Sequence, residues 1–240
     1  MESLLTLAPP AGRLIVFGDI HGCFDEMLRL LGRIAPTPDD LVIAVGDIVR
    51  KGPEPLRCLE LWRDRGYLAV VGNNEEKLLA TPWWRRLFLP AGDRAVLRRP
   101  DLVQFIESWP VVIDLPEAGA TIVHGGLLPH MNLTARDVEA HRADLIRLRW
   151  LRRTNGSWER VPKGKQQEGD VLWPSVWDGE RTVLYGHTPL REPRVEPRAI
   201  GLDTGCVYGG SLTAAIREEK AWRLVSEPAR RAYSSRQGLQ

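Results

Sequence analysis

The sequence contains few cysteines, and they are far apart. Cys23, Cys58 and Cys206 are the 3 cysteines among 240 residues, and no two of them form a CxxC pair. A disulfide framework or a structural zinc site normally shows an even or closely spaced set of cysteines. We therefore expect three reduced thiols, with neither a disulfide nor a structural zinc site.

Long apolar segments and an excess of charge are also missing. No apolar run approaches the roughly 20 residues that cross a bilayer, and the N-terminus has no basic region followed by an apolar signal core. Lys and Arg total 33 against 31 Asp and Glu, so the formal net charge of +2 gives no indication of binding to nucleic acid or to an anionic membrane. We expect a cytoplasmic protein without a membrane partner, in which any phosphate binding is local.

The length and composition are typical of a single globular domain. With 240 residues, 43% of them hydrophobic, the chain can bury one sizeable core. We expect a loose N-terminal arm at residues 1–10, one domain at 11–227 and a C-terminal tail at 228–240. Between about 76 and 110 the strand-like runs give way to helical patterns, which suggests a helical insertion.

Short apolar runs that end in polar residues recur along the chain. Five runs of strand character each stop at a glycine beside Asp, Asn or His. They end at Gly18-Asp19-Ile20-His21, Gly46-Asp47, Gly72-Asn73, His124-Gly125 and Gly186-His187. Ligands gather at the carboxyl ends of the strands in an open α/β sheet. These five strand ends can therefore place their polar side chains around one crevice.

The segments between these ends predict an α/β fold. Phe24 to Leu31 has helical periodicity, with acidic residues in its first turn, and Pro53-Glu54-Pro55 opens a second helix. Repeated strand–helix units imply a buried and largely parallel sheet. Several short strands in the second half of the chain suggest a second sheet packed on the first.

Taken in order, the motifs resemble those of a known family. They are Gly18 to Gly22, Gly46 to Gly52, Gly72 to Glu75, His124 to Gly126, Gly186 to Thr188 and Asp203 to Cys206. This ordered set resembles the calcineurin-like metallophosphoesterases, and specifically the phosphoprotein-phosphatase branch that includes bacterial diadenosine tetraphosphatases. Lys51, the segment Leu148-Arg149-Trp150 and the region 203–210 look most like the symmetrical bis(5'-nucleosyl)-tetraphosphatase group. The resemblance implies a two-sheet β-sandwich flanked by helices, in α-β-β-α layers.

The motif residues have the chemistry of a two-metal site. Two divalent ions about 3.5–4 Å apart can hold a phosphoryl group while they activate a bridging water for attack. The resemblance implies that Asp19 and His21 hold the first ion, that Asp47 bridges, and that the second ion has its own set of ligands. That second set is Asn73, His124 and His187. Nitrogen and oxygen ligands without thiolate suit manganese, iron or zinc better than calcium, and the resemblance favours manganese.

Three positions depart from the family pattern. Asn74 stands where the family carries the histidine that acts as general acid, and Arg50 stands where it carries the aspartate that orients this histidine. Lys51 replaces an arginine that binds phosphate, which keeps the charge but loses the bidentate guanidinium. We expect Lys51, together with one arginine of Arg147, Arg149 and Arg152, to position the phosphate, and Arg149 is our choice.

The loss of the general acid bears on the choice of substrate. A general acid contributes roughly 10²–10⁴-fold to rate, and a serine alkoxide needs that proton far more than a nucleotide phosphate, whose second pKa is roughly 6. We therefore expect hydrolysis of a phosphoanhydride in a nucleotide polyphosphate such as diadenosine tetraphosphate. Two alternatives stay open: a serine/threonine phosphatase that acts on a phosphoprotein, and an impaired protein that binds a phosphorylated ligand without turning it over.

Overall fold

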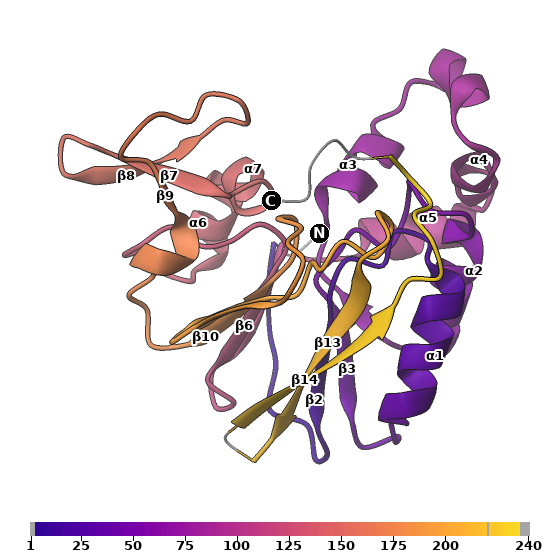
Figure 1. Ribbon diagram of the computed structural model, residues 1–240, viewed down its shortest axis with the longest axis horizontal. Helices are drawn as coiled ribbons and strands as arrows, with labels where there is room; N and C mark the ends of the chain where they lie inside the picture. Colours follow the sequence, from indigo (N-terminus) through magenta and orange to yellow (C-terminus); the bar gives the residue numbers. More distant parts are fainter. Residues whose placement is uncertain (1–2, 220, 236–240) are drawn as a thin grey trace.

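The protein folds around two β-sheets that pack face to face (Figure 1). The computed structural model describes residues 3–219 and 221–235. The five-stranded sheet has the order β14 (Ala221–Pro228), β13 (Ser211–Glu218), β2 (Leu14–Phe17), β3 (Leu41–Ala44) and β4 (Leu68–Ala69). The six-stranded sheet has the order β1 (Leu4–Thr6), β5 (Val112–Leu115), β6 (Ala120–Val123), β10 (Thr182–Tyr185), β12 (Ala199–Gly201) and β11 (Arg194–Glu196). The predicted two-sheet α/β fold is confirmed.

The continuous apolar runs arise because both faces of the central strands are buried. In β2 the side chains alternate: Leu14 and Val16 belong to the core between the two sheets, whereas Ile15 and Phe17 belong to the core beneath the helices. Ile122 on β6 meets the inter-sheet core from the opposite sheet. This double burial fixes the register of each strand and therefore the direction of the loop that follows it.

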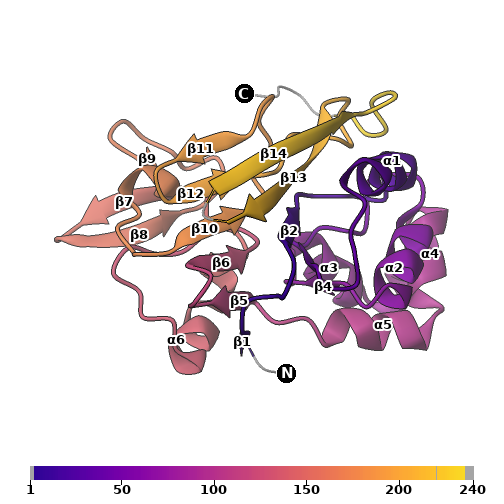
Figure 2. The same cartoon turned by 90° about the horizontal axis from the view of Figure 1, so that it is seen from below.

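Helices cover the outer face of the five-stranded sheet. They are α1 (Phe24–Ile34), α2 (Pro55–Asp64), α3 (Asn73–Leu79), the 3₁₀ helix η1 (Trp83–Phe88), α4 (Ala91–Leu97) and α5 (Pro100–Glu107). Figure 2 shows α1, α2, α4 and α5 together on one side of β2, with the six-stranded sheet on the other. The segment at about 76–110, which we expected to be a helical insertion, thus consists of helices. Among the described residues, no helix is long and apolar enough to cross a membrane.

A small third sheet, which we did not predict, lies beyond the six-stranded sheet. It consists of β8 (Ser157–Val161), β7 (Trp150–Thr154) and β9 (Val171–Leu172). The short elements α6 (Ala135–Ala140), α7 (Arg142–Leu145) and the 3₁₀ helix η2 (Trp173–Val176) flank it. In Figure 1 this sheet and helix α3 stand on opposite sides of the upper end of the two large sheets.

The expected loose ends are more ordered than we predicted. Within the arm at 1–10, Leu4–Thr6 forms β1, which pairs in parallel with β5 at the edge of the six-stranded sheet. In the tail at 228–240, Pro228 closes β14, and the Tyr233 backbone N–H donates to the carbonyl of Val207 at 2.9 Å. Residues 1–2 and 236–240 lie outside the described residues. The described part of the arm and the first part of the tail are therefore packed parts of the fold.

Candidate metal centre

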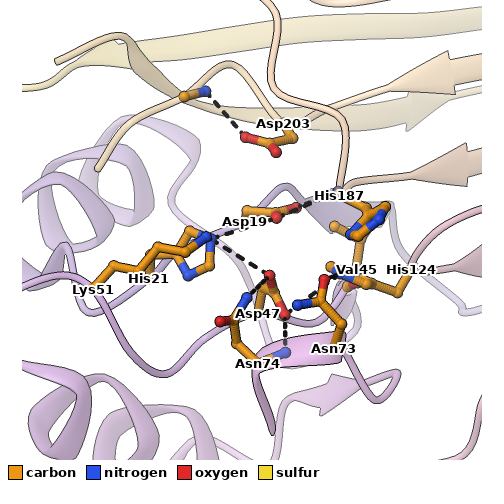
Figure 3. Close-up of polar contacts among 12 residues, drawn as sticks. Asp19, His21, Val45, Asp47, Lys51, Asn73, Asn74, His124, His187 and Asp203 are labelled. Atoms are coloured by element: carbon orange, nitrogen blue, oxygen red, sulfur yellow. Dashed lines mark hydrogen bonds and ion pairs between the residues drawn. The ribbon is translucent and has the colours of Figure 1, made fainter. Parts of the chain in front are cut away.

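The structure brings the six predicted ligand residues together at the carboxyl ends of the strands (Figure 3). Asp19 and His21 follow β2, Asp47 follows β3, and Asn73 begins helix α3 after β4. From the six-stranded sheet, His124 follows β6 and His187 follows β10. The strands β2, β3 and β4 run parallel to one another, as do β6 and β10, so their ends meet at one edge. The site therefore lies across the junction of the two sheets.

Asp47 occupies the middle of this group. Its Oδ2 is 3.4 Å from His21 Nε2, and its Oδ1 is 3.4 Å from His124 Nε2. Ligand atoms of Asp19, His21 and Asp47 all lie within 4.8 Å of one another, and all three residues are buried. A carboxylate that reaches one histidine from each sheet with separate oxygens has the geometry that a bridging ligand requires.

The orientation of His124 suits a metal ligand. Its Nδ1 lies 2.7 Å from the carbonyl oxygen of Val45, which can only accept a proton, so Nδ1 carries the hydrogen. Nε2 of the neutral ring then presents a lone pair to Asn73 Oδ1 at 3.2 Å and to Asp47 Oδ1 at 3.4 Å. Burial lowers the pKa of His124, so a second proton on Nε2 is disfavoured. A metal ion between Nε2 and the two oxygens would instead accept the lone pairs of all three.

His21 is arranged in the same way. Its Nδ1 donates to the carbonyl of Val49 at 3.1 Å, which leaves Nε2 free to face the centre. Burial and the adjacent Lys51 ammonium lower the pKa of His21 to about 3. Lys51 Nζ lies 2.7 Å from Nε2 and places a positive charge where a ligated ion would also contact this nitrogen. A metal bound by His21 would therefore require the Lys51 side chain to move aside.

The buried carboxylates around the centre repel one another. Burial, together with Asp203 and Asp47, raises the pKa of Asp19 well above its usual value. Burial also raises the pKa of Asp203 to about 6, although its Oδ1 accepts the Gly205 backbone N–H at 3.1 Å. Carboxylates held this close in a dry site are stabilised as anions by cations among them. The charges of the site and the Nε2 lone pair of His124 thus point to the same occupant.

Several residues in and beside the centre adopt left-handed backbone conformations. The φ angles are 47° at His21, 51° at Asp47, 67° at Arg50, 66° at Lys51 and 66° at His187. Such angles are unfavourable for residues with a β-carbon and persist only where the surrounding structure imposes them. Their concentration at the strand ends marks this edge as a functional site.

Comparison with known proteins gives the same assignment. The family model for calcineurin-like phosphoesterases matches residues 12–221. The chain belongs to the calcineurin-like phosphoesterase family. A bis(5'-nucleosyl)-tetraphosphatase PrpE, of the asymmetrical type, from Halalkalibacterium halodurans is 28% identical over 92% of this chain and 95% of the relative. A symmetrical bis(5'-nucleosyl)-tetraphosphatase from Vibrio parahaemolyticus is 29% identical over 85% of this chain and 95% of the relative.

Solved structures share the fold. A crystal structure provisionally named a diadenosine tetraphosphatase has a TM-score of 0.81 and 29% identity, and the match covers 95% of this chain and 99% of that one. A serine/threonine phosphatase from Saccharomyces cerevisiae has a TM-score of 0.59 at 15% identity over 95% of this chain and 84% of that one, which is a likeness of fold alone. The chain is therefore a metal-dependent phosphoesterase, and its family uses divalent metals.

Asn74 in this phosphoesterase lies at the centre, whereas Arg50 turns away from it. The backbone N–H of Asn74 donates to Asp47 Oδ1 at 2.8 Å, and its side-chain amide donates to Asp47 Oδ2. Arg50 Nε is 3.8 Å from the buried carboxylate of Asp93 on helix α4. Asn74 and Arg50, which we predicted to stand at the positions of the family's acid and its orienting partner, therefore face different groups.

Glu75 is a residue of the site that we did not predict. Its fully buried carboxylate accepts four backbone N–H groups: those of Asp47 at 2.9 Å, Ile48 at 2.8 Å, Val49 at 3.1 Å and Gly72 at 3.0 Å. Burial and Asp47 act to raise the pKa of Glu75, whereas the four donors stabilise its ionised form. One carboxylate thus ties the loop that carries Asp47 to the start of helix α3.

A pocket beside the six residues extends to the third sheet and is rich in basic side chains. Those that line it are Lys51, Lys77, Arg147, Arg149, Arg160 and Lys163. Arg149 Nη2 donates to the carbonyl of His187 at 2.7 Å, which places this predicted phosphate ligand beside the centre. We predicted no role for Lys77, Arg160 or Lys163. Arg160 lies on the third sheet and Lys163 in the loop after it, and we did not predict that sheet.

Proposed function

We propose that this phosphoesterase hydrolyses a phosphoanhydride bond in a dinucleoside polyphosphate such as diadenosine tetraphosphate. Asp19 and His21 would hold one divalent ion, Asp47 both ions, and Asn73, His124 and His187 the other. When bound, such ions supply positive charge to the phosphoryl oxygens and lower the pKa of the attacking water. Manganese, which the nitrogen and oxygen donor set accommodates, is our choice of metal.

The observation that carries this proposal is the charge of the pocket. Six basic side chains line it against three carboxylates, those of Asp19, Asp47 and Asp203, and the carboxylates are the groups that two divalent ions would neutralise. Arg147 and Arg160 also pair with Glu76 and Asp144, each at 2.6 Å. The four other basic side chains, those of Lys51, Lys77, Arg149 and Lys163, exceed what one phosphate monoester needs. They reach from Lys51 at the centre to Lys163 beyond β8, which suits a chain of several phosphates.

Asn74 supports an anhydride as the scissile bond. Its amide cannot supply the proton that an alkoxide leaving group needs, but a nucleotide phosphate leaves as a weak base with a second pKa of roughly 6. The hydrogen bonds from Asn74 to Asp47 hold the proposed bridging carboxylate in place. The names of the relatives from both tetraphosphatase types favour the same class of substrate.

A substrate panel tests the proposal against its alternatives. The purified protein, loaded with Mn²⁺, is expected to cleave diadenosine tetraphosphate faster than a phosphoserine peptide, with p-nitrophenyl phosphate as a monoester that has a good leaving group. Faster cleavage of the phosphopeptide would instead indicate a protein phosphatase. Bound metal without turnover of any of the three substrates would indicate a phosphate-binding protein.

Two variants sharpen this test. Asn74→His is expected to raise the rate on phosphoserine by more than the rate on diadenosine tetraphosphate, because only the serine alkoxide needs a proton from the enzyme in order to leave. Lys163→Ala should raise the KM for diadenosine tetraphosphate several-fold and leave that for p-nitrophenyl phosphate unchanged. Lys165→Ala is the matched control, since Lys165 is exposed and does not line the pocket. Equal effects of the two lysine variants would contradict a polyphosphate path along β8.

A further inference from the structure

Three buried side chains that play no part in the proposed reaction meet next to the metal centre. Cys23 precedes helix α1, Glu26 lies in its first turn, and Cys206 lies in the loop that follows Asp203. One ligand atom from each, a thiol sulfur or a carboxylate oxygen, lies within 4.8 Å of the other two. All three residues are buried. The fold thus gathers two of the cysteines that are far apart in the sequence.

Glu26 has one oxygen that is fixed and one that lacks a partner. Oε1 accepts from the Tyr233 hydroxyl at 2.9 Å, the Arg230 backbone N–H at 3.1 Å and Arg29 Nη2 at 3.2 Å. Oε2 is buried and has no hydrogen-bond partner among the described residues. A buried carboxylate oxygen without a partner is costly, on the order of 1–3 kcal/mol. Metal-ligating carboxylates are commonly held in this way, with one oxygen hydrogen-bonded and the other left for the ion.

We propose that Cys23, Glu26 and Cys206 form a second metal site, separate from the dinuclear centre, which binds one zinc ion. Two thiolates and a carboxylate form a donor set that zinc accepts, whereas the dinuclear centre contains no sulfur. Sulfur atoms about 2.3 Å from a tetrahedral zinc ion are about 3.8 Å apart, so the observed grouping needs only small movements to close around it. Each thiol releases its proton to solvent as the ion binds.

The surroundings provide a route and a fourth ligand. A cleft lined by Phe24, Glu26, Arg230 and Tyr233, among others, reaches the carboxylate from the surface. A water molecule from this cleft can complete the tetrahedral coordination. A zinc ion here would depart from our expectation of no structural zinc site, which rested only on the number and spacing of the cysteines along the chain.

Such an ion would join three segments that frame the catalytic edge. Cys23 is two residues after His21, and Cys206 is three residues after Asp203. Through Glu26 the ion would also brace the segment at Arg230 and Tyr233 against helix α1. Its role would be structural, and binding would stabilise the folded state by mass action.

Cobalt provides a spectroscopic test, because Co²⁺ replaces zinc and absorbs strongly in the near ultraviolet only when thiolate is bound. Reduced, metal-free protein titrated with Co²⁺ is expected to show this charge-transfer band, and added Zn²⁺ should remove it. The band should persist in Asp47→Asn, which disrupts the dinuclear centre. It should be lost in Cys23→Ser and Cys206→Ser, while Glu26→Gln keeps the band but requires several-fold more Co²⁺.

Cys58→Ser is the matched control, since Cys58 is equally buried but is not one of the three grouped residues. It should leave the cobalt band unchanged. Absence of the band from the wild-type protein would overturn the proposal, and so would its loss in Cys58→Ser or its persistence in Cys206→Ser. The wild-type and Asp47→Asn titrations decide the matter even if the cysteine variants fail to fold.

Discussion

Replacing Glu75 with glutamine removes the charge of the carboxylate and turns one of its oxygens into an N–H donor. In the structure each oxygen accepts two backbone N–H groups, so two of the four donors would then face another donor. A buried N–H group left without an acceptor costs about 1–3 kcal/mol. We therefore expect Glu75→Gln to lower the free energy of unfolding by about 2–6 kcal/mol, a large part of a typical 5–15 kcal/mol.

Urea denaturation with a chelator present measures this loss without a contribution from bound metal. Glu76→Gln is the matched control, because Glu76 is the next residue of helix α3 and forms partly exposed ion pairs with Arg142 and Arg147. Such pairs contribute at most about 1 kcal/mol. A loss of less than about 1 kcal/mol in Glu75→Gln would refute the reasoning, because a neutral side chain would then serve the backbone donors as well as a carboxylate.

Three further predictions concern metal, geometry and pH. Chelation should lower phosphoesterase activity by about 10³-fold or more, and added Mn²⁺ should restore it, as a timed assay before and after dialysis would show. Gly186→Ala should reduce activity by about 10²-fold, because the new β-carbon would lie 2.0 Å from Asp19 Oδ1; calorimetric titration should show weaker Mn²⁺ binding, and unchanged binding would contradict this explanation. Burial raises the pKa of Asp40, but hydrogen bonds from Arg13 outweigh this effect and hold the pKa below its usual range. The Arg13–Asp40 pair therefore stabilises the protein above about pH 4, and this stabilisation is lost as the pH falls through the lowered pKa. Asp40→Asn should lower the free energy of unfolding by about 1–3 kcal/mol at pH 7 and by less at pH 2, measured by urea denaturation at both pH values.

The parts of the fold that the sequence predicted are those in which local pattern and long-range packing agree. Leu14–Phe17 is apolar throughout because both its faces are buried, and the polar residues Asp19 and His21 begin where that burial ends. The same pattern predicts that Asp47 and His187 lie just after the ends of strands, as they do after β3 and β10. Once parallel strands were predicted, the convergence of their ends followed from geometry.

What the sequence could not predict depends on partners that are distant along the chain. Glu75 resembles an ordinary acidic residue in the first turn of a helix, and its role arises from the backbone N–H groups of the loop at Asp47. Leu4–Thr6 is too short to identify as a strand, and it is ordered by pairing with β5 and by the packing of Leu4 and Leu5 against the two cores. The sheet that contains Trp150 carries alternating polar residues over short strands, a weak signal that a loop also gives.

The left-handed backbone at His21, Asp47, Lys51 and His187 has a consequence for how this enzyme can be changed. Each of these conformations is unfavourable by about 1–2 kcal/mol for a residue other than glycine. Glycine at any of these positions would relax that strain. Where the lost side chain contributes little to packing, the result would be a more heat-resistant protein that lacks a proposed metal or phosphate ligand. Selection for thermal stability alone would therefore tend to erode the catalytic edge, so any search for hardier variants should screen for retained activity at every round.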